Sequence, residues 1–353
     1  MIYPVKKDID YLTLKITDNC NMNCYMCGQR NSSKIQRTSI DFQLIKKRID
    51  ETKTIKTVYL FGGEPLMYDE LPELLSYLKD KKIDVLITTN GLLLKKWAPI
   101  LMDSSVRDLT ISIDSYSSDK YYKIRGVNCL KQIQENIYCF IEEKKKRGIS
   151  KPYLGINCVI LPENFKELLD YYHWIDENFP EVSRINFEAP MRVDACLGNE
   201  YEQIMRNELN TDAYSWRGFR NSHIKFSEED IVEVLDKMEE LKKQKKVTFL
   251  SPTDKKEVER TFGGHGMEIK QTCKMPTHAL TVLTNGDVVF CTDFPDYILG
   301  NLNNGSLEEI MNGERANKFR DIILRSGLPI CTICPRYHDK GEFLINEGDN
   351  INE

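Results

Sequence analysis

Three cysteines stand close together near the start of the chain, in the stretch Cys20-Asn-Met-Asn-Cys24-Tyr-Met-Cys27. Thiolates are the usual protein ligands of iron–sulfur clusters. Three of them can hold three irons of a [4Fe–4S] cube and leave the fourth iron open to a substrate or cofactor. A zinc knuckle would want a fourth Cys or His nearby, and the sequence has none between Asp8 and Asp50. We therefore expect Cys20, Cys24 and Cys27 to bind a [4Fe–4S] cluster.

A second set of four cysteines lies in the last third of the chain, at Cys273, Cys291, Cys331 and Cys334. Four thiolates can close one [4Fe–4S] cluster, and the same spacing permits a four-cysteine zinc ribbon. Within this region 279–292 alternates apolar residues on both sides of an Asn-Gly pair, which predicts a β-hairpin. A metal-binding unit built around a hairpin is the expectation for this part of the chain.

The composition narrows the class of protein. The chain has 353 residues, enough for two domains, and its net charge of −5 argues against nucleic acid as the main partner. No apolar run is long enough to span a membrane, and residues 1–10 lack the apolar segment of an export signal. Eleven cysteines without such a signal point to metal binding, because the cytosol keeps thiols reduced. We expect a cytoplasmic protein with no membrane partner.

Strand-like runs alternate with amphipathic helical runs from Tyr11 to about Pro190, which predicts βα units and a parallel sheet. In barrels of such units the functional side chains lie at the carboxyl ends of the strands. The expected strands are Tyr11–Thr17, Thr57–Phe61, Val85–Thr89, Asp108–Ile113, Leu154–Leu161 and Arg184–Glu188.

Polar motifs follow these strands directly. Gly62-Gly63-Glu64-Pro65 comes after the second strand, where glycines let the backbone approach a ligand and a carboxylate can pair with an ammonium group. Asn90 ends the third strand. Arg125, downstream of the fourth strand, is suited to clamp a carboxylate with two hydrogen bonds.

The cysteine spacing, the Gly-Gly-Glu-Pro motif one strand later and the six strands together resemble the radical S-adenosylmethionine (SAM) superfamily. The resemblance implies an α/β fold, an open (β/α)6 barrel over residues 1–235, and SAM bound to the open iron. One electron, supplied by flavodoxin or ferredoxin, then breaks a C–S bond, and a 5′-deoxyadenosyl radical removes a hydrogen atom from the substrate. The cofactor-binding residues that it implies are Gly62, Gly63, Glu64, Pro65, Asn90, Ser112, Asp114, Arg125, Asn157 and Met26.

Individual roles follow from the same resemblance. Glu64 would bind the amino group of SAM, Arg125 its carboxylate, and Ser112 or Asp114 the ribose. Asp114 as the N-cap of a helix is the structural alternative. Many members have an aromatic residue just before the third cysteine, near the adenine, and this chain has Met26 there, a soft side chain that can substitute.

The later cysteines resemble the twitch domain, the shortened form of the SPASM domain. Gly286-Asp-Val-Val-Phe-Cys291 and Cys331-Thr-Ile-Cys334 carry this likeness. It implies a second, auxiliary [4Fe–4S] cluster in a small α+β domain over 236–338, followed by a flexible tail over 339–353. Zinc is the alternative metal.

Cys196 is expected in a polar loop, 191–199, just beyond the sixth strand and facing the substrate. It is a candidate hydrogen-atom donor, although most free cysteines have no chemical role. The surrounding region 192–226 is rich in aromatic and charged residues. It would form either a cover over the barrel mouth or a surface excursion.

Twitch-bearing enzymes act on several substrate classes. We expect a net oxidation or bond formation on a ribosomal peptide, even though a first strand near Tyr11 leaves no room for a leader-binding domain before it. The alternatives are dehydrogenation of a small sugar-like or aminocyclitol metabolite and redox-neutral epimerisation with Cys196. The GTP-rearranging relative is less apt, because the chain lacks a double-glycine end. A non-catalytic metal scaffold would not need Glu64 and Arg125.

Overall fold

The computed structural model describes residues 8–31, 38–266 and 273–335. One ten-stranded sheet forms its centre, in the order β10-β9-β8-β1-β2-β3-β4-β5-β6-β7. Neighbouring strands are parallel from β8 through β7, whereas β8–β9 and β9–β10 are antiparallel. The strands are β1 (Tyr11–Thr17), β2 (Thr57–Gly62), β3 (Asp84–Thr89), β4 (Val106–Ser112), β5 (Tyr153–Val159), β6 (Val182–Glu188), β7 (Val247–Leu250), β8 (Ala279–Val282), β9 (Asp287–Val289) and β10 (Gly300–Asn301).

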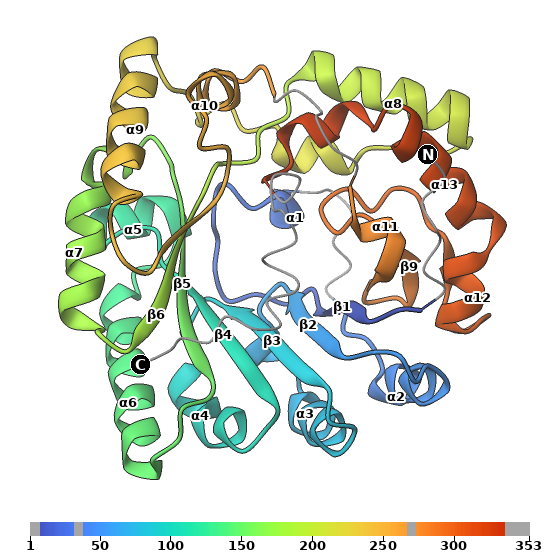
Figure 1. Cartoon of the computed structure of the whole chain (residues 1–353), viewed down its shortest axis with the longest axis horizontal. Helices are drawn as coiled ribbons and strands as arrows, with labels where there is room; N and C mark the ends of the chain where they lie inside the picture. Colours follow the sequence, from blue (N-terminus) through green and yellow to red (C-terminus); the bar gives the residue numbers. More distant parts are fainter. Residues whose placement is uncertain (1–7, 32–37, 267–272, 336–353) are drawn as a thin grey trace.

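Helices wrap the outside of this curved sheet, as Figure 1 shows for α2, α3, α4, α6 and α7. The α-helices are α1 (Gly28–Asn31), α2 (Phe42–Glu51), α3 (Leu71–Asp80), α4 (Leu94–Met102), α5 (Ser118–Arg125), α6 (Leu130–Arg147), α7 (Leu168–Asn178), α8 (Ala195–Leu209), α9 (Glu228–Leu241), α10 (Lys255–Gly263), α11 (Met275–His278), α12 (Leu307–Asn312) and α13 (Glu314–Arg325). Short 3₁₀ helices are η1 (Pro65–Met67), η2 (Phe165–Glu167), η3 (Ser215–Phe219) and η4 (Pro329–Ile333).

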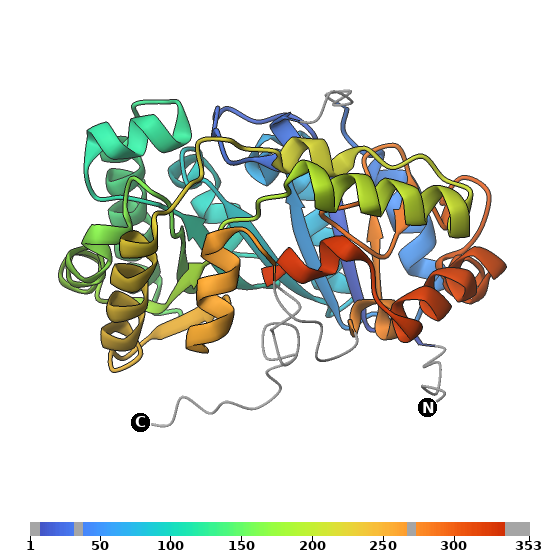
Figure 2. The same cartoon turned by 90° about the horizontal axis from the view of Figure 1, so that it is seen from above.

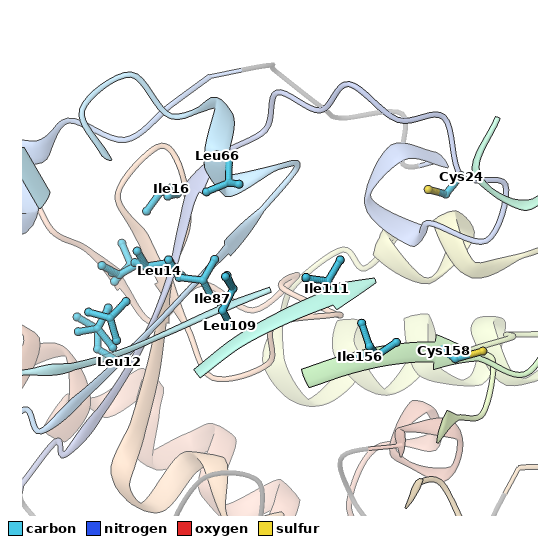
Figure 3. Close-up of a cluster of buried hydrophobic side chains, with 14 of the residues drawn as sticks. Leu12, Leu14, Ile16, Cys24, Leu66, Ile87, Leu109, Ile111, Ile156 and Cys158 are labelled. Carbon is cyan, nitrogen blue, oxygen red and sulfur yellow. The ribbon is translucent and has the colours of Figure 1, made fainter. Parts of the chain in front are cut away.

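The two faces of the sheet differ in polarity because side chains alternate along each strand. One face carries Leu12, Leu14, Ile87, Ile111 and similar residues, which are buried against the outer helices (Figure 3). The opposite face carries polar residues in the same strands: Thr13, Lys15, Tyr59, Thr88, Thr110, Ser112, Asn157, Asn186 and Thr248. The outer layer therefore holds the fold together, and the inner face is left polar for a site.

The partial barrel is confirmed, with each of the six expected strands present to within two residues at either end. The sequence interpretation missed β7, a four-residue strand that follows a run of lysines and pairs with β6. The expected hairpin is β8 and β9, with Gly286 at φ 83° in its turn. It is not a separate sheet, because β8 pairs with β1.

The expected border between 235 and 236 falls inside α9. Since β7 and α10 still pack on the barrel side, through β6 and α9, we propose to place the division between α10 and Cys273. The expected tail over 339–353 lies outside the described residues. Among the helices that the structure describes, none is long and apolar enough to cross a membrane.

Candidate active site

The first three cysteines lie on the loop that joins β1 to α1. Cys20 is exposed, Cys24 is buried and Cys27 is half-buried. The end of α5 holds this loop, because Asn23 N donates to Arg125 O at 2.9 Å and Tyr25 N donates to Ile124 O at 3.1 Å. The sequence-distant α5 thus fixes the backbone on both sides of Cys24 (labelled in Figure 3).

Gly62 and Gly63 bring β2 into direct contact with the same loop. A Cβ on Gly63 would lie 2.2 Å from Asn19 O, and one on Gly62 would lie 2.2 Å from Thr17 O. Gly63 N and Glu64 N donate to Thr17 O and Asn19 O, each at 2.7 Å. The close approach expected of these glycines is therefore made to the cysteine loop, and only glycine fits there. Pro65 begins the 3₁₀ helix η1 that follows.

Glu64 is buried beneath the loop, with 2 % of its surface exposed. Its Oε1 accepts from Thr89 Oγ1 at 2.6 Å and from Leu66 N at 3.1 Å, and its Oε2 accepts from Asn90 N at 2.8 Å. Burial raises its pKa, and these donors and Arg125 only partly oppose that effect. An ionised carboxylate has about four acceptor positions. One position thus remains for a cationic partner.

Arg125 and Asp114 form a buried ion pair beside Cys24. Arg125 Nε donates to Asp114 Oδ2 at 2.5 Å, and Arg125 Nη1 lies 3.7 Å from Cys24 Sγ. Burial opposes the charged form of Arg125, but the charge and hydrogen bond of Asp114 together with Cys24 and Tyr121 leave its pKa well above the usual value. The Asp114 side chain is fully buried, and its Oδ1 accepts from Val159 N at 2.9 Å.

Asp114 accepts one hydrogen bond on each oxygen, from Arg125 and Val159, and its contact with a ribose stays a prediction. The N-cap alternative is wrong, because α5 begins at Ser118 and Ser117 is its N-cap. Asp114 also positions Arg125.

The other expected cofactor residues lie around this centre. Asn90 Nδ2 donates to Asn21 Oδ1 in the cysteine loop at 2.7 Å. Ser112 is half-buried at the end of β4 and lies opposite Asn157 in the register with β5. Asn157 Nδ2 donates to Glu188 Oε2 at 3.0 Å, so its side chain lies on the polar inner face as expected.

Met26 lies against a small apolar cluster of Ile124, Leu161 and Ile224. Tyr25 packs on the same cluster, and its hydroxyl donates to Glu163 Oε2 at 2.7 Å. The aromatic residue is thus tied to the end of the barrel wall, while the thioether of Met26 contributes to the apolar surface next to Cys27.

The second set of cysteines comes from three segments that the fold brings together. Cys291 follows β9, Cys331 lies on η4, Cys334 follows η4, and Cys273 precedes α11. Burial raises the pKa of Cys331 to about 12 and also raises the pKa of Cys291. Cys331 and Cys334 add to the shift at Cys291, and Cys273 adds to the shift at Cys331, so the four thiols lie within electrostatic reach of one another.

Both sets fit iron–sulfur clusters. Burial likewise raises the pKa of Cys24, and the thiolate form at each set requires nearby cations that the irons would supply. Among the described residues no three Cys, His, Asp or Glu side chains are drawn together closely enough to hold a single metal ion. A [4Fe–4S] cube takes one thiolate per iron, so a set of three cysteines and a set of four are each compatible with one such cluster.

Cys196 does not lie in a loop, which corrects the sequence interpretation. It is the second residue of α8, whose N-cap Asp194 accepts from Leu197 N at 2.8 Å. Cys196 is exposed to solvent. Cys129 and Cys158 are buried and Cys139 is half-buried, so these three serve packing.

Several contacts of the site had no sequence signal. Asn21 and Glu163 bond to Asn90 and Tyr25 across sequence separations that no local pattern reveals. Thr284, in the hairpin turn, donates to Asp18 Oδ2 at 2.8 Å, two residues before Cys20. The sequence could have suggested these contacts only through the expectation that all of these segments lie at the ends of neighbouring strands.

Comparisons with known proteins agree with this geometry. The sequence profile of the radical SAM superfamily matches residues 14–175, and that of an iron–sulfur cluster-binding domain, SPASM, matches 273–335. The GTP 3′,8-cyclase of Aliarcobacter butzleri is 34 % identical over 163 residues, 44 % of this chain and 48 % of the relative. A probable GTP 3′,8-cyclase of Sulfolobus acidocaldarius is 32 % identical over 184 residues, which are 51 % of this chain and 56 % of the relative. The match thus spans about half the length of these curated relatives.

Two solved structures share the fold. Streptococcus suis SuiB bound to its precursor peptide SuiA has a TM-score of 0.62 at 15 % identity, covering 87 % of this chain and 65 % of SuiB. The anSMEcpe structure with bound AdoMet, which is SAM, has a TM-score of 0.61 at 14 % identity. The alignment covers 95 % of this chain and 96 % of anSMEcpe. Identities this low establish the fold alone. The chain belongs to the radical SAM superfamily, with a C-terminal SPASM/twitch domain, and its cofactors are [4Fe–4S] clusters and SAM.

Proposed function

We propose that this enzyme uses SAM to oxidise an unactivated C–H position of its substrate. When SAM and the reduced cluster of Cys20, Cys24 and Cys27 are bound, they supply a 5′-deoxyadenosyl radical that removes a hydrogen atom. The observation that carries the proposal is the pairing of this loop with Glu64 and Arg125, two opposite charges buried beside it.

The roles that we propose follow the charges of SAM. Glu64 accepts the ammonium group at its remaining acceptor position, and Arg125 donates to the carboxylate. Asp114 holds the guanidinium in place through Nε. Ser112 and Asn157, on the polar inner face, are proposed to meet the ribose.

The remaining parts of the site shape it. Met26, beside Ile124 and Leu161, is proposed to offer the adenine an apolar surface. Gly62 and Gly63 press β2 against the cysteine loop, and Asn90 holds the loop through Asn21.

The auxiliary set supports oxidation as the outcome. We propose that Cys273, Cys291, Cys331 and Cys334 would hold an auxiliary cluster through four thiolates, which would supply an acceptor for one electron from the substrate. The substrate would lose one hydrogen atom to the radical, that electron to the cluster and one proton to solvent, so the product would carry two hydrogens fewer, as a ketone, an alkene or a new C–S or C–C bond. The alternative is redox-neutral epimerisation, in which an exposed thiol such as Cys196 returns a hydrogen atom.

A ribosomal peptide is the substrate class that we propose first. The likeness to SuiB supports this proposal only through the fold, because SuiB has the same fold and binds a precursor peptide. A second candidate is a small molecule or nucleotide, because the curated relatives are GTP 3′,8-cyclases. The low-potential electron would come from flavodoxin or ferredoxin. Adding GTP to the assay described next separates the two classes. GTP should accelerate SAM cleavage only if the substrate of the enzyme is a nucleotide.

The test is SAM cleavage by anaerobically reconstituted protein with dithionite. We expect about eight irons per chain, as two clusters, and slow formation of 5′-deoxyadenosine. With substrate in deuterated water, oxidation gives a product lighter by two hydrogens and tolerates Cys196→Ala. A product with an unchanged hydrogen count and one solvent deuterium would replace oxidation by epimerisation. Zinc in the second set, or no SAM cleavage, would refute the proposal.

A further inference from the structure

A segment that no family motif accounts for spans the distance between the two sets of cysteines. This bridge segment, residues 195–226, consists of α8, η3 and the turn that follows. Figure 2 shows α8 lying across the C-terminal elements, and α8 packs on η4, which carries Cys331. At its other end, η3 packs on α1, which follows Cys27 directly.

The auxiliary end of the bridge segment is fastened by one carboxylate. Asp296, five residues after Cys291, accepts from Tyr214 N and Ser215 N at 3.1 Å through Oδ1. Its Oδ2 accepts from Tyr201 Oη at 3.0 Å and from the hydroxyl of Ser215. All four donors belong to the bridge segment, so Asp296 uses the full acceptor capacity of its carboxylate there.

The other end touches the SAM side of the cysteine loop. A Cβ on Gly218 would lie 2.0 Å from Gly28 O, so the two backbones are in direct contact. Asn221 Nδ2 donates to Tyr25 O at 2.9 Å. Ile224 belongs to the apolar cluster on which Met26 packs.

Between its ends the bridge segment is densely packed. A Cβ on Gly198 would lie 2.3 Å from the Trp216 ring, and Trp216 Nε1 donates to Glu202 Oε1 at 2.8 Å. Phe294, two residues before Asp296, has its ring 5.2 Å from that of Phe219. Packed interiors transmit displacements instead of absorbing them. A shift at Asp296 should therefore move η3.

We propose that Asp296 is a positioning residue for SAM binding. It holds the bridge segment so that Gly218, Asn221 and Ile224 keep the Cys24–Cys27 loop in its binding geometry. The auxiliary region and the SAM site are thus coupled, and by thermodynamic reciprocity SAM binding must stabilise the region around Asp296. This inference rests on the SAM site proposed above, and it adds a residue in the auxiliary region to those that govern it.

The experiment compares Asp296→Ala with Asp212→Ala in the reconstituted full chain. Asp212 is a matched control, since its carboxylate lies in the bridge segment itself but is 78 % exposed and pairs only with the exposed Arg206. The readouts are SAM affinity by anaerobic equilibrium dialysis, the iron content with the spectra of both clusters, and hydrogen exchange of residues 22–28.

For Asp296→Ala we expect both clusters, about tenfold weaker SAM binding, a usual size for coupling between two sites, and faster exchange in 22–28. Asp212→Ala should match the wild type. In the wild type, SAM should also slow exchange around 293–297, and Asp296→Ala should lose that effect. A purely structural role would lower the melting temperature without changing SAM affinity, and that result would overturn the inference.

If Asp296→Ala does not retain the auxiliary cluster, Ser215→Ala decides instead, because it removes one of the four bonds and leaves the carboxylate in place. Weaker SAM binding with both clusters present supports the coupling, and unchanged binding rejects it. Failure of the proposed function looks different, because then the wild type itself would neither bind nor cleave SAM.

Discussion

The buried pair of Asp114 and Arg125 offers the sharpest test of how the site is built. Asp114→Ala leaves the guanidinium in the interior, with 10 % of the Arg125 side chain exposed, and removes its anion. It also leaves Val159 N without its acceptor. The perturbation therefore leaves a buried charge without its anion and a half-buried N–H without its acceptor.

The magnitude follows from these two losses. Removing one partner of a buried ion pair costs about 3–5 kcal/mol, and the lost hydrogen bond of the half-buried Val159 N–H adds about 1 kcal/mol. Such a sum approaches the whole stability of many proteins, about 5–15 kcal/mol. Replacing both residues, as Asp114→Leu with Arg125→Met, removes both charges and should cost much less than the two single changes together.

The assay is a double-mutant cycle measured by urea unfolding, with iron content checked for every variant. We expect a coupling of roughly 2 kcal/mol or more between Asp114 and Arg125. The matched control is the exposed pair of Lys255 and Glu259, 4.0 Å apart with side chains 78 % and 47 % exposed, whose coupling should be about 0–1 kcal/mol. Equal couplings in the two cycles would refute the burial argument.

Three further predictions concern the cofactors. Burial raises the pKa of Glu64, so at low pH the ammonium group of SAM must displace a proton from this carboxyl group. SAM affinity, measured by dialysis, should therefore fall as the pH drops through the pKa of Glu64. Glu64→Gln should abolish this pH dependence, and a Gln variant with the same pH dependence would contradict the prediction. Gly63→Ala should lower iron to about four per chain with the auxiliary spectrum intact, since its Cβ would meet Asn19 O; full iron content would argue against this contact. Replacing Cys331 and Cys334 by Ala should also leave about four irons, those of the SAM-binding cluster, and a complete loss would disprove independent sites.

Most of the barrel could be predicted because its signals are local. Strands such as Tyr153–Val159 alternate apolar residues with polar ones or glycine, and the cysteine spacing predicts the cluster ligands without any tertiary information. β7 was not predicted, because its four residues follow a lysine run and show almost no hydrophobic periodicity. A capping box is another local signal, and Ser306 and Glu309 form one at the start of α12.

The site was harder to predict where one residue type serves two roles. A carboxylate after a strand suits a ribose as well as an arginine, and only tertiary packing shows that Asp114 faces Arg125. Cys196 was placed in a loop because its neighbourhood is polar, but Asp194 caps a helix there. The partners of Asp296 come from residues 201–215 and could not be foreseen from sequence, since long-range hydrogen bonds leave no periodic trace.

The pairing of β8 with β1 has a consequence for how the chain is made. β1 is synthesised well before β8, the strand that covers one of its edges. Until residues 279–282 are available, β1 presents unpaired N–H and C=O groups along that edge, and exposed strand edges invite association with other chains.

Pairing over so long a separation is also slow, because the entropy of closing the loop is lost before the contacts form. The loop that carries Cys20, Cys24 and Cys27 follows β1 directly, so its surroundings are completed last as well. Nascent chains therefore pass through an interval in which these thiols are synthesised but not yet enclosed. That interval gives the machinery that delivers iron and sulfide its widest access to them.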